Sequence, residues 1–144
     1  MTTDVDLRLR HLDTLQSVIN RLAQNSFTVR GWSITLVSLV FAIVGTQGKA
    51  SAGLVLLTLV PAWTFWGLDA FYLRQERLFR RLYSATARRL RDGDAAPDVV
   101  PFDMDVEPYK AGGSGWWRAL VAPSTAVIPI MLSVVAVSYW LIRA

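Results

Sequence analysis

The sequence predicts an all-α membrane protein with three transmembrane helices, the first two of which continue outside the membrane as a cytoplasmic helical hairpin. Three observations support this fold class. Hydrophobic residues make up 53% of the 144-residue chain and the mean hydropathy is +0.35, both high for a soluble domain. Three apolar stretches are long enough to cross a bilayer. The length accommodates one membrane domain, residues 1–144.

The N-terminal segment, residues 5–30, is expected to form a cytoplasmic helix that runs directly into the first span, at about 31–47. Thr3 or Asp4 is suited to cap it, and no proline or glycine precedes Gly31. Its apolar residues recur at helical spacing: Leu12, Leu15, Ile19 and Leu22. One nearly continuous helix to residue 46 is therefore predicted.

A cleaved secretory signal peptide is the competing interpretation of the first span. Ala50, Ser51 and Ala52 loosely resemble a cleavage site. However, the residues before the span are too many and too regularly patterned for the basic leader of a signal. A retained span is the favoured interpretation.

The second span, at about 52–72, continues as a cytoplasmic helix over residues 73–92, since no helix breaker occurs before Gly93. The extension has an apolar side: Leu78, Phe79, Leu82, Tyr83 and Leu90. Two helices that leave the bilayer together, each with an apolar stripe, are expected to pack as an antiparallel hairpin.

The loop at 93–119 contains a short segment of alternating character. Every second residue is apolar, at Val100, Phe102, Met104 and Val106. The residues in the alternate positions are mostly acidic: Asp103, Asp105 and Glu107. This period predicts an extended segment whose apolar side docks on the hairpin, with the acids solvated or facing arginines. A divalent cation on the three acids is an alternative, although their spacing lacks the geometry of a calcium loop.

The third span, at about 120–142, contains two prolines. Pro123 and Pro129 are expected to act as kinks, which a membrane helix tolerates when neighbouring groups satisfy the freed carbonyls. Three spans place the chain's two ends on opposite sides of the membrane.

The orientation follows from the lysines and arginines. Four precede the first span, one lies in the first turn, nine lie between residues 74 and 118, and one is Arg143. Cytoplasmic segments carry the excess of basic residues. The N-terminus is therefore expected on the cytoplasmic side and the C-terminus on the opposite side. In the bacterial inner membrane, which the family resemblance described below implies, that opposite side is the periplasm.

Asp69 lies inside the apolar boundary of the second span, where an unpaired carboxylate is costly. Folding the hairpin about residues 48 and 49 brings Arg30 to nearly the same depth, so an Arg30–Asp69 ion pair is predicted. The pair either fixes the register of the hairpin or serves in gating or conduction. A polar cluster around it is expected to involve Asn25, Ser26 and Thr28, unless these are ordinary residues of the helix surface.

Five arginines after the second span share one helical face: Arg74, Arg77, Arg81, Arg88 and Arg91. One interpretation is a solvated face beside the lipid headgroups. The other is an anion or partner surface, for a nucleotide signal, a phospholipid, nucleic acid or an acidic protein segment. Of these, nucleic acid is the least expected, because the basic residues flank apolar spans.

Small residues form a packing face on the first span: Gly31, Thr35, Ser38, Ala42 and Gly45. A second set lies on the third span: Ala126, Pro129, Ser133 and Ala136. Such faces allow helices to approach closely. If one is used within the chain, the other is left for self-association, so a homo-oligomer is expected; purely intramolecular packing is the alternative.

No enzymatic activity is expected. The chain has no cysteine and a single histidine, His11, which excludes thiolate and histidine-cluster metal sites. It contains no catalytic triad spacing, no phosphate loop and no zinc-protease motif. Accordingly, no catalytic residue, metal or cofactor is predicted.

Two stretches, RLAQNSFTVRGWSITLVS and FWGLDAFYLRQERLFRRLY, together with PFDMD in the loop, resemble a family of small bacterial membrane proteins that is similar in build to membrane effectors of antiviral defence systems. The resemblance covers about a third of the chain. It gives weight to two groups of residues: Asn25, Ser26, Arg30, Gly31 and Trp32, and Asp69, Gln75, Glu76, Arg77, Phe79, Arg80 and Tyr83.

The resemblance and the predicted topology lead to two function hypotheses. In the first, the protein self-associates in the lipid bilayer as a membrane-perturbing or pore-forming effector, triggered by a soluble protein partner or a nucleotide signal. In the second, it is a non-conducting anchor or adaptor that recruits a soluble partner through its cytoplasmic hairpin. Leakage of ions would distinguish the two.

Overall fold

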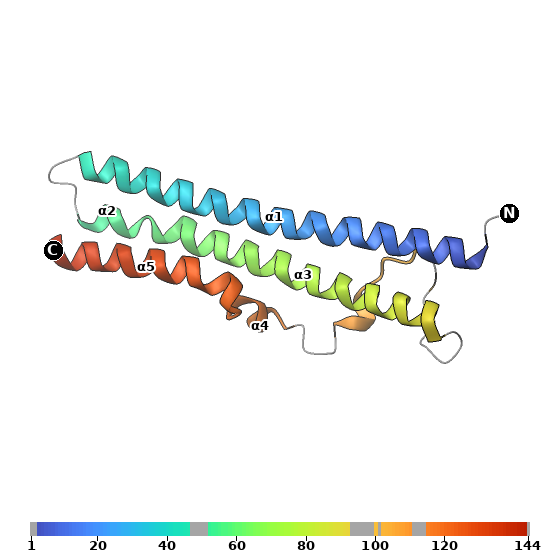
Figure 1. Cartoon of the computed structure of the whole chain (residues 1–144). Coiled ribbons are helices and arrows are strands. Elements are labelled where there is room, and N and C mark those ends of the chain that lie inside the picture. The colour runs from blue at the N-terminus through green and yellow to red at the C-terminus, as the bar shows by residue number, and fades with distance from the viewer. Residues whose placement is uncertain (1–2, 47–51, 93–99, 101, 111–114, 144) are drawn as a thin grey trace.

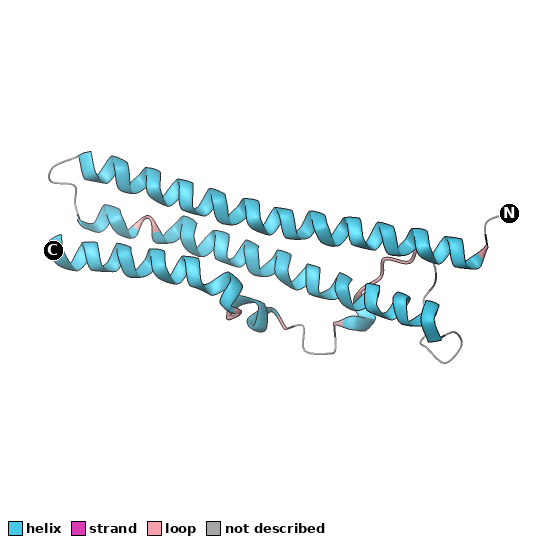
Figure 2. Ribbon diagram, in the orientation of Figure 1, coloured by secondary structure: helices cyan, strands magenta, loops and turns pink. Residues whose placement is uncertain are grey.

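The computed structural model describes residues 3–46, 52–92, 100, 102–110 and 115–143. Within these ranges the chain is helical, with no strand (Figures 1 and 2). The elements are α1 Asp4–Thr46, α2 Ala52–Leu56, α3 Leu59–Asp92, the 3-10 helix η2 Glu107–Tyr109, α4 Trp116–Leu120 and α5 Pro123–Arg143. They form a long rod in which α1 and α3 lie side by side, and the N- and C-termini lie at opposite ends (Figure 1).

Three of the helical stretches are long and apolar enough to cross a membrane. They are Asp4–Val44, Leu54–Asp92 and Pro123–Ile142. Most of their apolar surface is not covered within the chain, and large side chains such as Leu39, Trp63 and Val134 are more than half exposed. Such uncovered apolar helices need a lipid or protein surround.

α1 is a single unbroken helix whose start is capped by Thr3. The Asp6 N–H donates to Thr3 Oγ1 at 3.3 Å, and the Thr3 N–H donates to Asp6 Oδ2 at 3.1 Å. This reciprocal arrangement satisfies two of the free N–H groups at the helix start. With no proline in its sequence, the helix then continues for 43 residues.

The second apolar stretch is not the continuous helix that the sequence analysis expected. A turn at Leu57 and Thr58 separates α2 from α3. Pro61 explains the break, because it has no N–H to donate to the carbonyl four residues earlier and its ring crowds that carbonyl. The Leu57 carbonyl, which Pro61 cannot bond, accepts from the Val60 N–H at 3.2 Å. The Thr58 hydroxyl adds a bond to the Val55 carbonyl at 2.6 Å.

The third apolar stretch also begins differently from the expectation. The predicted loop contains α4, and Val121 and Ala122 form a turn before α5. Pro123 is the first residue of α5 rather than a kink, in the position where its missing N–H has no cost. Pro129 lies inside α5, as predicted, and the Ser133 hydroxyl donates to its carbonyl at 2.7 Å.

α3 lies at the centre of the packing, between α1 and the other helices. Close to the end of α1, Val44, Val55 and Ala136 form one buried cluster. Further along the rod, Ala70 of α3 packs against α4. Beyond α4, α1 and α3 continue as a pair. Leu15 of α1 packs there with Leu82 and Ala85 of α3. Three residues of the loop cover this cluster: Met104, Val106 and Tyr109.

The loop segment docks only in part. Met104 and Val106 pack on the α1–α3 pair. Phe102 stacks on His11 of α1 but is still 50% exposed, and Val100 is 62% exposed. Residues 103–106 form no strand and lead into η2. The expected apolar side is therefore divided, because the backbone turns at Phe102, which has a φ of 65°, and the alternation of an extended chain is lost there.

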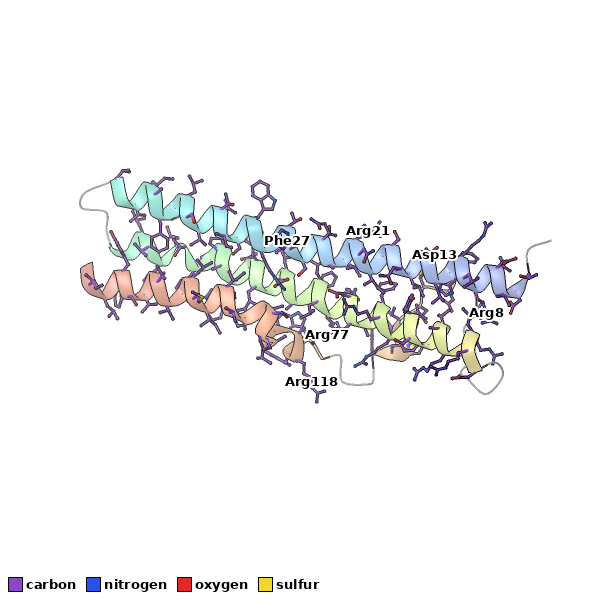
Figure 3. The ribbon with its side chains drawn as sticks, in the orientation of Figure 1. Arg8, Asp13, Arg21, Phe27, Arg77 and Arg118 are labelled. Carbon is purple, nitrogen blue, oxygen red and sulfur yellow. The ribbon has the colours of Figure 1, made fainter. Side chains whose placement is uncertain are left out.

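Side chains drawn along the rod show where the basic groups lie (Figure 3). Arg8 and Arg21 are on the N-terminal half of α1, and Arg118 extends away from α4. Arg77 of α3 donates to the backbone carbonyl of Arg118 at 3.4 Å. The basic residues thus gather on the half of the rod that lies beyond α5.

Candidate functional site

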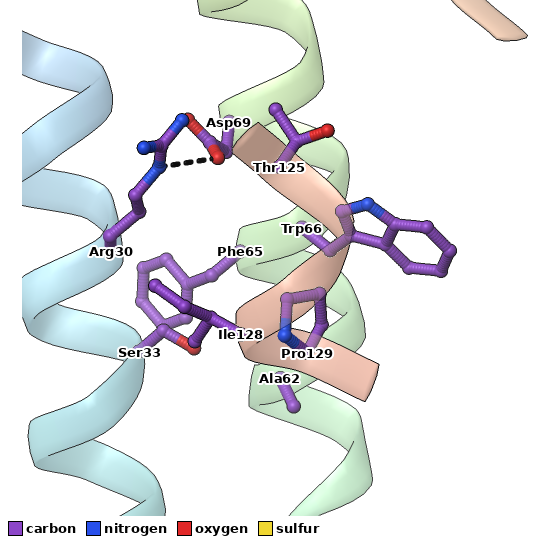
Figure 4. Close-up of a pocket in the computed structure, with 9 residues that line it drawn as sticks. All are labelled: Arg30, Ser33, Ala62, Phe65, Trp66, Asp69, Thr125, Ile128 and Pro129. Atoms are coloured by element: carbon purple, nitrogen blue, oxygen red, sulfur yellow. Dashed lines mark hydrogen bonds and ion pairs between the residues drawn. The ribbon is translucent and has the colours of Figure 1, made fainter. Parts of the chain in front are cut away.

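The strongest candidate site is an ion pair between the two long helices (Figure 4). Arg30 of α1 reaches across to α3, where its Nε lies 2.7 Å from Asp69 Oδ2. Ser26 donates its hydroxyl to the other carboxylate oxygen, Oδ1. The side chain of Asp69 is 4% exposed and that of Arg30 is 28% exposed. The structure thus brings together the residues for which an ion pair was predicted.

Helix geometry explains which polar neighbours join the pair. Ser26 and Arg30 are four residues apart, so both point at the same face of α3. Thr28 is exposed and donates instead to the Gln24 carbonyl at 3.0 Å. Asn25 is half-buried and lies about 100° around the helix from Ser26. The predicted polar cluster is therefore reduced to Ser26.

A small cavity of about 10 Å³ adjoins the ion pair. It is lined by Ser33 of α1, Phe65 and Trp66 of α3, and Thr125 and Pro129 of α5, among others. This volume has room for about one water molecule. Within one chain, the pair therefore lies beside a small, partly open and mostly apolar cavity.

The turn between α4 and α5 carries polar contacts that the sequence analysis did not identify. The Thr125 hydroxyl lies within 3.0 Å of three backbone carbonyls, those of Ala119, Leu120 and Ala122. The Trp66 Nε1–H also donates to the Leu120 carbonyl, at 3.0 Å. These donors satisfy carbonyls that the break in the helix leaves open. Nothing in the local pattern of either residue marks this role.

The predicted arginine surface divides into residues with different roles. Arg77 and Arg81 reach other elements, since Arg81 donates to the Tyr109 carbonyl of η2 at 2.9 Å. Arg88 and Arg91 bond locally, to the Ser84 carbonyl and to Asp92. Arg74 is half-buried. The stripe is therefore not a uniformly solvated face.

Arg80, which lies outside the predicted stripe, helps to form a hollow of about 330 Å³ on α3. Its lining comprises Arg80, Arg81, Ser84 and Arg88 of α3 and Tyr109 of η2. Arg80 Nη2 lies 2.7 Å from Glu76 Oε1. The sequence indicated this hollow through the consecutive residues Arg80 and Arg81, which place cationic groups on two adjoining faces of the helix.

Two side chains of the acidic segment accept hydrogen bonds from the backbone of the same segment. Asp103 and Asp105 each accept a hydrogen bond, at 2.9 Å, from the N–H two residues further on. Glu107 pairs with Lys110. All three acids are exposed, and among the described residues no group of three or more acids, histidines or cysteines is placed to hold a metal ion.

The two small-residue sets have different surroundings. On α1, Gly31, Thr35, Ser38 and Ala42 are all exposed, while the exposure of Gly45 lies outside the description. On α5, Pro129 and Ala136 are buried, and Ala126 and Ser133 are half-buried. The chain thus uses the α5 set for its own packing and leaves the described part of the α1 set uncovered.

His11 is a buried residue that the sequence analysis considered only as a metal ligand. Its side chain is 0% exposed, and neither ring nitrogen has a hydrogen-bond partner within the described structure. Its ring stacks on Phe102, with the centroids 6.0 Å apart. Burial lowers the pKa of His11 below its usual value of 6.5, against the opposing effect of Asp103. One feature of the sequence indicated this burial: His11 precedes Leu15 by four residues, so the two share the apolar side of α1.

Comparison with known proteins adds no assignment: no protein-family model, no curated protein and no solved structure matches this chain. The function must therefore be argued from the geometry.

Proposed function

We propose that the protein is a small inner-membrane protein of bacteria that self-associates and acts as a membrane-perturbing or pore-forming effector. In this arrangement α2 with the first part of α3, the second half of α1, and α5 cross the bilayer. The remainder of α1 and α3 forms a cytoplasmic hairpin. The excess of basic residues on the hairpin and its flanks supports this orientation.

The observation that carries the self-association is the uncovered small-residue face of α1. Gly31, Thr35, Ser38 and Ala42 are exposed, and the Thr35 hydroxyl is already satisfied by the Gly31 carbonyl at 3.0 Å. Small residues on such a face let a second helix approach closely. A second copy of the chain is the occupant we propose, because two such faces are complementary to each other.

Permeabilisation would require this assembly. Among the described residues of one chain, the cavity beside Arg30 and Asp69 holds only about 10 Å³, so a lumen would have to form between several copies joined through their α1 faces. The motif resemblance to antiviral membrane effectors is consistent with this role, as an analogy of architecture. The cytoplasmic hairpin would receive the trigger.

A non-conducting anchor or adaptor is the second candidate function. It is favoured by the complete pairing of Asp69 with Arg30 and Ser26, which suits a fixed structural link between the helices. In that case the basic surface of α3 would recruit a soluble partner.

The test is membrane depolarisation on induced expression, compared with a variant designed to block association. A Cβ at Gly31 would meet no atom within 4 Å, so Gly31→Leu is tolerated by the single chain but obstructs a helix packed against this face. Val60→Leu, at a position 63% exposed on α3, is the matched control. A loss of about 1.4 kcal/mol lowers association about tenfold.

We expect the wild type and Val60→Leu to depolarise cells and to cross-link as oligomers, and Gly31→Leu to do neither. Under the pore hypothesis, Asp69→Ala or Arg30→Ala also alters the leak. Absence of any leak from the wild type, with its oligomers intact, would reject the effector role and favour the anchor.

A further inference from the structure

The hollow between α3 and η2 concentrates positive charge. Arg80, Arg81 and Arg88 line it together with Ser84 and Tyr109, and none of these described lining residues is acidic. Glu76 pairs with Arg80, and Asp92 interacts electrostatically with a second arginine of the hollow, Arg88. Three guanidinium groups around one open volume form a site for a multiply charged anion.

The arginines of the hollow are held in position by bonds that leave room for a ligand. Arg80 is oriented by Glu76 and Arg88 by the Ser84 carbonyl at 3.3 Å. A guanidinium has five N–H donors, so one such bond does not exhaust its capacity. Arg81 ties the floor of the hollow to η2 through the Tyr109 carbonyl. A preorganised guanidinium loses less entropy when it binds.

The position of the hollow along α3 distinguishes a soluble ligand from a lipid headgroup. Leu73 packs against α4, whose Trp116 and Trp117 are 41% and 74% exposed, as suits an aromatic belt at a membrane surface. Arg81 lies eight residues beyond Leu73 and Arg88 fifteen, which corresponds to about 12 and 22 Å along a helix. A headgroup layer is about 5–8 Å thick on each side.

We propose that this hollow binds a water-soluble ligand through its phosphate groups. Its volume of about 330 Å³ falls at the lower end of small-molecule sites, which suits a compact phosphorylated molecule. Planar guanidinium groups match phosphate oxygens in pairs. The Ser84 hydroxyl donates to the Arg80 carbonyl at 2.9 Å, so the arginines supply the donors. The ligand would bridge α3 and η2, and so fix the loop segment against the hairpin.

The choice of a soluble ligand rests on the proposed membrane placement, whereas phosphate binding itself does not. An experiment can therefore reject phosphate binding without rejecting the proposed membrane placement, and the reverse.

The test is calorimetric titration of inorganic pyrophosphate into the full-length protein in phosphatidylcholine nanodiscs. The variant is Arg80→Gln with Arg88→Gln, since both side chains are exposed. The control is Arg10→Gln with Arg21→Gln, two exposed arginines of α1 that do not line the hollow and that change the net charge equally. Thermal unfolding of each variant verifies folding.

We expect saturable binding that the Arg80/Arg88 variant weakens by at least about tenfold, while the control variant differs from wild type by less than about twofold. Lack of pyrophosphate binding, or an equal loss in the control, overturns the site. Tighter binding of polyglutamate than of pyrophosphate assigns the hollow to an acidic protein segment and overturns the phosphate proposal. If a phospholipid co-purifies with the wild type but not with the Arg80/Arg88 variant, the phosphate group belongs to a lipid, and the proposal of a water-soluble ligand is rejected.

Discussion

Two buried polar residues, Asp69 and His11, lie at different points of the same helix pair and differ in their hydrogen-bond partners. Asp69 lies between apolar helices and receives both a guanidinium and a hydroxyl. His11 is equally enclosed, yet neither of its ring nitrogens has a hydrogen-bond partner in the described part of the chain. One site is fully paired and the other is left unsatisfied.

The difference follows from charge. An ionised carboxylate in an apolar surround costs far more than a neutral polar group, so it persists only with a partner. A neutral imidazole can remain buried at a cost of a few kcal/mol or less. The Asp69 site is therefore held together by its partners, whereas the site at the other end of the α1–α3 pair depends on His11 remaining neutral.

Breaking the ion pair is expected to have the largest effect. Asp69→Ala leaves Arg30 enclosed without its counter-charge and should lower the free energy of unfolding by about 3 kcal/mol. Measurement by steric trapping or thermal unfolding in lipid nanodiscs would test this.

The control removes both charges. Arg30→Leu combined with Asp69→Leu should remain within about 1 kcal/mol of the wild type, because paired apolar side chains replace the ion pair at little cost. If the double variant is as unstable as Asp69→Ala, the pair itself contributes the stability and the comparison with His11 fails.

Replacing His11 should have a smaller effect of opposite sign. His11→Leu removes two unsatisfied polar atoms from an enclosed site next to Leu15 and should raise the free energy of unfolding by about 1 kcal/mol at pH 7.5. Thermal unfolding of the two proteins measures it. A lower stability of the variant would indicate that the imidazole has a partner, such as a bound water.

The same site should make stability depend on pH. Burial lowers the folded-state pKa of His11, with Arg8 adding to this and Asp103 opposing it. The unfolded chain therefore binds a proton before the folded one does, and stability falls as the pH drops through about 6.5, levelling below the folded-state pKa. His11→Leu should lack this fall. Hydrogen exchange of residues 102–110 between pH 7.5 and pH 5.5 would localise it.

The smallest expected effect concerns the α4–α5 turn. Thr125→Val removes the buried hydroxyl that faces three carbonyls and should cost about 1 kcal/mol. Thr28→Val is the matched control, since its exposed hydroxyl donates only within α1, to Gln24, and should change stability by less than about 0.5 kcal/mol. Chemical unfolding in detergent compares the two. Equal losses would mean that the turn carbonyls find other donors.

Local spacing was a sound guide where one helix repeat decides the outcome. The four-residue interval between Ser26 and Arg30 places both on the face that meets Asp69, and the antiparallel packing of α1 and α3 brings them to the same depth. The same reasoning did not identify the breaks at Leu57–Thr58 and Val121–Ala122. There, Pro61 and Pro123 act through a missing N–H, and whether a helix kinks, ends or restarts depends on which neighbour satisfies the free carbonyls.

The sequence by itself determined the three apolar helices, the continuous α1 and the complementary charges at Arg30 and Asp69, because hydropathy and helical period are properties of neighbouring residues. Only the tertiary structure decided that Thr125 and Trp66 support one turn, that Arg80 joins the anion hollow and that His11 is enclosed. Each of these depends on contacts between residues far apart in the chain. Such contacts form only once α3 is packed against α1, α4 and the loop. Local spacing places Arg80 and His11 on a helical face but does not name the partner that each one meets.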